Sequence, residues 1–150
     1  MGARAGYPEQ TICNVAQEIS AGMVCYLNLD TLETESVMGE SYNVYWDDDF
    51  SEYYQKTEKI LEGWKRYIRF TPPEPWESFK IMEDFVGICV PDSDKLKERL
   101  WNALSGKKPF RNFKYLIEGS GYRQIWFEYR QSRLEEMVRS NLEISSGAGI

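Results

Sequence analysis

Apolar and polar side chains alternate along short segments in the first half of the chain. The clearest case is residues 42–46 (Tyr-Asn-Val-Tyr-Trp), where the period of two is typical of a half-buried strand. Residues 23–29 form an apolar run that ends at a turn-like Asp30-Thr31-Leu32-Glu33, so a strand and a returning strand around 36–38 are expected. A further strand is expected over residues 65–71, closed by two prolines.

Apolar residues recur at helical spacing through most of the remaining chain. Helices are expected over residues 11–20, 50–63 and 76–90, from a cap at 92–94 to Gly106, and over residues 110–118 and 122–142. The helix at 76–90 is expected to bury one face made of Trp76, Phe79, Met82, Val86 and Cys89. The pattern therefore predicts an α+β fold, with a small antiparallel sheet of about three strands in the N-terminal half packed against a mostly helical C-terminal half.

The length of 150 residues suits one domain, and no linker or repeat marks an internal boundary. We expect a single domain over residues 1–150, with an ordered core at about 10–143 and loose tails at both ends. No apolar run approaches the length of a membrane span, and residues 1–9 lack the apolar region of a signal peptide, so we expect no membrane association.

The charge is unevenly distributed along the chain. Its net value is −6, but residues 1–62 carry 12 acidic and 3 basic side chains, whereas residues 63–150 carry 12 acidic and 15 basic ones. Such a division steers an anionic partner to one part of the chain or lets its two halves attract each other.

The absence of histidine excludes several kinds of site at once. No Ser-His or Cys-His catalytic arrangement and no histidine metal site is possible. Cys13, Cys25 and Cys89 are too few and too scattered for a disulfide framework or a zinc site, so we expect reduced, buried thiols in the cytoplasm. Residues 47–58 copy some ligand positions of a calcium loop, but Glu52 replaces the required glycine. We expect no metal, no cofactor and no catalytic residue.

Several short motifs resemble an uncharacterised bacterial protein family, family 0158. The motifs are Arg66-Tyr67-Ile68-Arg69-Phe70 with two prolines, Met82-Glu83-Asp84-Phe85, Leu100 to Gly106, Phe110-Arg111-Asn112-Phe113-Lys114, and Trp126-Phe127-Glu128-Tyr129-Arg130 with Arg133-Leu134. The resemblance covers roughly residues 12–142 and implies a bacterial cytoplasmic protein. The family has no established activity, so the resemblance implies no particular function.

Five cations near the C-terminal end are candidates for binding an anion or a partner: Arg111, Lys114, Arg123, Arg130 and Arg133. The last three fall within the apolar arc of the helix over 122–142, so some of them should be half buried. Glu83 lies on the apolar side of its own helix, which suggests a buried ion pair of Glu83 with Arg130. An anion-binding pocket with one arginine available is the alternative.

The leading functional hypothesis is a non-enzymatic binding or regulatory module that acts on an unknown protein partner or by self-association. Its candidate contact surface is the acidic, aromatic segment 42–54, represented by Tyr42, Trp46, Asp48 and Tyr53. The alternative is binding of nucleic acid or a phosphate ligand through the basic region 107–133, where aromatic and cationic residues interleave. An enzyme ranks third and would have to use carboxylates, lysine or arginine.

Overall fold

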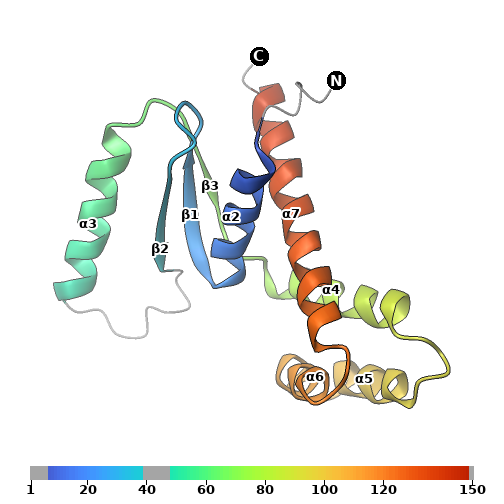
Figure 1. The fold of residues 1–150 in the computed structure, drawn as a ribbon. Coiled ribbons are helices and arrows are strands. Elements are labelled where there is room, and N and C mark those ends of the chain that lie inside the picture. Colours follow the sequence, from blue (N-terminus) through green and yellow to red (C-terminus); the bar gives the residue numbers. More distant parts are fainter. Residues whose placement is uncertain (1–6, 39–47, 149–150) are drawn as a thin grey trace. The chain divides into compact units, whose positions relative to one another are not determined.

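The computed structural model describes residues 7–38 and 48–148, and the side chains of 7–38 and 55–144. Within these ranges the chain forms six helices and one three-stranded antiparallel sheet, with the strands in the N-terminal half, which confirms the α+β prediction (Figure 1). The predicted strand over 42–46 lies outside the described residues. The chain groups into two compact units, residues 1–72 with 134–150 and residues 73–133. The number of domains stays a prediction.

The sheet belongs to the first unit and is built around its first strand. Strands β1 (Met23–Asn28), β2 (Thr34–Met38) and β3 (Tyr67–Phe70) are arranged in the order β2-β1-β3. Both neighbours run antiparallel to β1, with Cys25 opposite Ser36 on one side and Phe70 on the other. Because β1 has a partner along each edge, its backbone groups are satisfied by the ladder.

The turn between β1 and β2 is organised by the buried side chain of Asn28. Its Oδ1 accepts hydrogen bonds from the backbone N–H groups of Asp30 (2.8 Å) and Thr31 (3.2 Å). The backbone of the same residue accepts from Leu32 N–H and donates to Glu33 O, both at 2.8 Å. Asparagine is favoured here because its amide can bond the backbone two or three residues farther along the chain.

Helix α2 (Glu9–Ser20) supplies the main apolar surface against β1. Its buried residues Ile12, Val15, Ala16 and Ile19 recur at helical spacing, and Figure 1 shows α2 beside the strand. Gly22 then adopts a φ of 89°, which only glycine takes up without steric cost, and so turns the chain from α2 into β1.

The remaining elements of the first unit are α3 (Asp48–Glu62), beside β2 in Figure 1, and the C-terminal part of α7 (Arg123–Ala148). Arg139 of α7 is ion-paired with Glu9 of α2 and with Glu135 of its own helix. Helix α7 continues beyond residue 143, where we expected a loose tail, since each added helical residue gains a backbone hydrogen bond.

The second unit consists of α4 (Pro75–Cys89), α5 (Lys95–Ser105), α6 (Pro109–Glu118) and the start of α7. Its core is an aromatic cluster in which the rings of Phe85 and Phe113 lie 5.1 Å and 5.0 Å from that of Trp126. Both contacts are edge-to-face, the arrangement that aromatic quadrupoles prefer.

The expectation that Trp76 belongs to the core is wrong. Its side chain is 71% exposed, and the buried residues of α4 are Ile81, Phe85 and Val86. Trp76 lies in the first turn of the helix, directly after Pro75, whereas the buried positions lie in its second and third turns. Phe79, Met82 and Cys89 are half buried, whereas Ile81 and Phe85 are buried, so spacing alone placed the buried face on a neighbouring arc of the helix.

Candidate functional site

Helices α5 and α6 lie side by side, joined by only three residues, and their sequence explains both helices. Asp94 caps α5 by accepting a hydrogen bond from Leu96 N–H (2.9 Å), and Gly106 follows its end. Pro109 occupies the first turn of α6, where its missing N–H costs nothing. The facing apolar positions are buried in both helices: Leu100, Leu104, Phe113 and Ile117.

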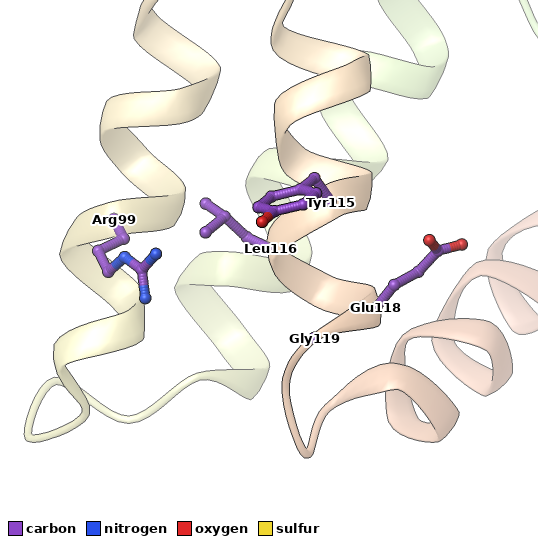
Figure 2. A pocket seen from close by; sticks show the side chains of 5 residues that line it. All are labelled: Arg99, Tyr115, Leu116, Glu118 and Gly119. Atoms are coloured by element: carbon purple, nitrogen blue, oxygen red, sulfur yellow. The ribbon is translucent and has the colours of Figure 1, made fainter.

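A shallow groove lies on the surface of this pair, formed by two neighbouring hollows of about 430 and 420 Å³ that are open to solvent. The hollows share Arg99 of α5 with Tyr115 and Leu116 of α6. Figure 2 shows Leu116 pointing from α6 toward α5, with the Tyr115 ring next to it and the Arg99 guanidinium on the α5 side. The groove therefore combines an apolar floor, an aromatic ring and a cation.

Polar groups extend the groove in both directions. Asn102 and Asn112 line one hollow, and Glu118 and Gly119 line the other. Asn112 Nδ2 donates to the backbone oxygen of Lys107 (2.9 Å), which holds its amide in place. Glu118 points away from Arg99 in Figure 2 and so leaves the guanidinium facing the groove.

The helix pair is strongly basic within an acidic chain. Residues 95–118 contain seven basic and two acidic side chains, a net charge of +5, against −6 for the whole chain. Among the side chains that the structure describes, none forms an ion pair or hydrogen bond with that of Arg99, Arg111 or Lys114. Lys97, by contrast, is paired with Asp92 at 2.7 Å. Most of the positive charge on this pair therefore faces solvent.

The structure separates the five predicted cations. Arg111 and Lys114 are exposed on α6, where Arg111 lies one helical turn before Tyr115. Arg123 lies over the ring of Phe127 at 4.7 Å. The other two, Arg130 and Arg133, are half buried.

Arg133 belongs to a cluster that joins α4 and α7. Its Nη1 donates to Asp84 Oδ2 (2.9 Å) and to the Tyr129 hydroxyl (2.8 Å). Lys80 Nζ lies 2.9 Å from the other Asp84 oxygen. The hydrogen bond from Lys80 holds the pKa of Asp84 below its ordinary value, and the bond from Arg133 acts in the same direction. The cluster uses the charge of Arg133 for structure.

Arg130 lines a separate pocket with apolar residues of α4 and with Phe110 and Trp126. Burial lowers the pKa of its guanidinium, since a charge is less stable away from water. The pairing of Arg130 with Glu83 stays a prediction, as does the contact surface at segment 42–54. Tyr42 and Trp46 lie outside the described residues, and Asp48 and Tyr53 lie in the part of α3 whose side chains are not described.

The sequence analysis missed Arg99, Asn102 and Tyr115. The sequence did contain information that predicts this groove, because the connection between α5 and α6 is too short to let the two helices separate. Positions that flank the buried stripe of each helix must then lie along one groove.

Comparison with protein families supports the resemblance of the sequence motifs. The model of an uncharacterised protein family, UPF0158, matches residues 30–146, most of the chain. The chain belongs to this family. The UPF0158 match includes all of α4, α5 and α6, so the groove lies within the part of the chain that defines the membership. Comparison with curated proteins and with solved structures found no match.

In the part that the structure describes, no group of three or more cysteine or carboxylate side chains is placed to hold a metal ion. None of the described helices has the length and apolar character needed to cross a bilayer.

Proposed function

We propose that the chain is a non-enzymatic binding module that holds single-stranded nucleic acid along the groove between α5 and α6. The observation that carries this proposal is the position of an exposed aromatic ring, Tyr115, beside cations that have no partner among the described side chains. Tyr115 is 76% exposed, a large area to leave in water unless a planar partner covers it.

Each component of the groove matches a component of a nucleic-acid strand. Bases stack on aromatic rings with little regard to sequence, and cations follow the phosphates. Arg99 and Arg111 flank Tyr115 from α5 and from one turn earlier on α6. The amides of Asn102 and Asn112 add donors and acceptors for base edges. The lining residues are mostly exposed, which suits a polymer lying along the surface better than an enclosed small molecule.

Contacts between cations and phosphates make the affinity sensitive to salt, because each contact releases counterions from the strand. Each phosphate contact to a single strand contributes a slope of roughly −0.7 to the dependence of log K on log salt. With Arg99, Arg111, Lys107 and Lys108 engaged, we expect a slope of about −3.

The test is fluorescence anisotropy with a labelled oligouridylate of about 12 nucleotides, within the range that single-strand sites cover. Tyr115→Ala and Arg99→Gln should each weaken binding about fivefold or more, because each base stack contributes roughly 1–3 kcal/mol. Arg69→Gln is the matched control, since Arg69 is an exposed cation on β3 in the other unit.

Inorganic polyphosphate separates stacking from charge alone. Tyr115→Ala should weaken binding of the oligonucleotide but leave the affinity for polyphosphate unchanged. Equal effects on both ligands, or equal losses in Arg69→Gln and Arg99→Gln, would contradict the proposal. Binding of a purified protein partner that is insensitive to Arg99→Gln and Tyr115→Ala would support the protein-binding hypothesis in its place.

A further inference from the structure

The second unit carries an exposed aromatic surface made of Trp76, Phe79 and Phe110. Trp76 of α4 is 71% exposed, and Phe110 of α6 is 39% exposed. Phe79 connects them, because it lies one helical turn after Trp76 and its ring packs edge-to-face on that of Phe110, with centres 6.3 Å apart. Contiguous exposed apolar side chains mark an interaction surface, whereas single ones are ordinary.

The aromatic surface and the groove lie on opposite flanks of α6. Phe113 and Ile117 form the buried stripe of this helix. At about 100° per residue, Phe110 lies on one side of the stripe, and Leu116, which lines the groove, lies on the other. The aromatic surface is therefore a feature separate from the groove and needs an explanation of its own.

The pocket between α4, α6 and α7 adjoins the aromatic surface. It is open to solvent and has a volume of about 320 Å³. Pro73 and Pro75, the latter directly before Trp76, line it together with Phe110 and Trp126. A protruding indole and a largely apolar pocket therefore lie next to each other on one surface.

The aromatic surface has charges of opposite sign at its two edges. Glu74 and Glu77 flank Trp76 at the start of α4, whereas Lys114 lies exposed on α6, one turn after Phe110. Among the described side chains, none forms an ion pair with Glu74, Glu77 or Lys114. Glu77 instead accepts a hydrogen bond from the backbone N–H of Glu74 at 2.8 Å. The surface is thus acidic at its α4 edge and basic at its α6 edge.

We propose that the aromatic surface is the interface of a two-fold symmetric dimer of this chain. A two-fold axis places the same surface of two copies face to face, so the surface must be complementary to itself. The acidic α4 edge of each copy then faces the basic α6 edge of the other, which a surface of one sign could not do without repulsion. The Trp76 indole of each copy enters the pocket between Pro75 and Phe110 of the other, and its burial supplies the apolar contact.

Sedimentation velocity of the full chain over a range of concentrations tests the proposal. The mass should approach twice that of the monomer as the concentration rises, and Trp76→Ala should weaken self-association about tenfold or more, because a central aromatic side chain is lost. Ile88→Ala is the matched control and should have no effect, since Ile88 is 73% exposed at the other end of α4. A chain that stays monomeric would overturn the proposal and leave the surface to a different protein. Equal effects of Trp76→Ala and Ile88→Ala would reject this surface as the interface.

Charge-swap variants test the two-fold arrangement. Glu74→Lys and Lys114→Glu should each weaken self-association about tenfold, because the axis repeats each like-charge contact. An equimolar mixture of the two variants should regain the association of the original chain as a heterodimer, since each edge then faces the opposite charge. The hydrogen bond from the Glu74 N–H to Glu77 is kept in Glu74→Lys, because its donor is a backbone group. A mixture that associates no better than either variant alone would overturn the arrangement.

Discussion

At the scale of single residues, two positions differ in how well the residue type suits the local backbone conformation. Asn28 closes the β1–β2 turn through its amide oxygen, and Lys108 takes a left-handed conformation with φ 49° directly before α6. The first position gains hydrogen bonds from its residue type, and the second bears a steric cost because lysine has a Cβ.

Asn28→Ala should lower the free energy of unfolding by about 2 kcal/mol, because two backbone N–H groups lose their acceptor in a part-buried turn. Urea denaturation followed by circular dichroism measures the change. Thr31→Ala is the control in the same turn, since its hydroxyl accepts one exposed hydrogen bond and its loss should cost about 0.5 kcal/mol or less. Equal losses in the two variants would show that the amide of Asn28 does not organise the turn.

Lys108→Gly should leave the thermal midpoint unchanged or raise it, because relief of the left-handed strain offsets the flexibility that glycine adds to the unfolded chain. Lys107→Gly removes the same charge from the neighbouring residue, whose φ is not positive, and should lower stability by about 0.5–1 kcal/mol. Differential scanning calorimetry of both variants makes the comparison. A lower midpoint for Lys108→Gly than for Lys107→Gly would contradict the argument.

At the scale of elements, helix ends were easier to predict than buried faces. Gly22, Gly106, Pro91 and Pro109 mark boundaries because their backbone restrictions act locally, and the observed helices end or begin near them. The buried face of α4 depends on which helices pack against it, and this information is not local. The exposure of Trp76 and the groove beside Tyr115 were therefore missed for the same physical reason.

Two ion pairs between α4 and α7 can be tested by mutation: the observed pair of Asp84 with Arg133 and the predicted pair of Glu83 with Arg130. Asp84→Ala should cost about 2 kcal/mol, since half-buried Arg133 then loses its carboxylate partner and keeps the hydrogen bond to the Tyr129 hydroxyl. The sequence-based pair of Glu83 with Arg130 instead predicts a loss of about 3–5 kcal/mol in Glu83→Ala. Chemical denaturation of each variant measures its loss of unfolding free energy. A change within about 0.5 kcal/mol for Glu83→Ala would reject that pair.

At the scale of the whole molecule, some basic residues form ion pairs within the chain and others do not. The sequence alone showed that the basic residues gather in the second half of the chain, but not which of them have partners. Arg133 and Lys97 pair with carboxylates, whereas the described side chains leave Arg99 and Arg111 without one. Pairing depends on distances between helices, which neither composition nor periodicity supplies.

The pH dependence of stability should be flat near neutrality and steep in acid. No histidine is present, so no side chain with an ordinary pKa between 5 and 8 changes its charge there. Hydrogen bonds from Lys80, from Lys97 and from the Leu96 N–H lower the pKa values of Asp84, Asp92 and Asp94, respectively. A lowered folded pKa contributes stability that is present above the unfolded value of about 4 and is lost as the pH falls through the folded pKa.

Thermal melts at intervals from pH 8 to pH 2.5 measure this profile. The midpoint should change little from pH 8 to pH 5 and fall below about pH 4. Asp84→Asn and Asp94→Asn should each reduce the acid-side slope, because each removes a carboxylate whose protonation opposes folding. A midpoint that falls between pH 7 and pH 5 would contradict the assignment.

The order of strands in the sheet has a consequence for how the chain tolerates change in length. Strand β3 pairs with β1 across the long segment that follows β2, and Leu27 faces Ile68 in that pairing. The chain entropy lost in closing such a loop grows only with the logarithm of its length, so doubling the segment adds about 0.6 kcal/mol. Insertions between β2 and β3 that lie outside α3 should therefore cost the sheet little, whereas a deletion within α3 would also remove a helix that packs beside β2.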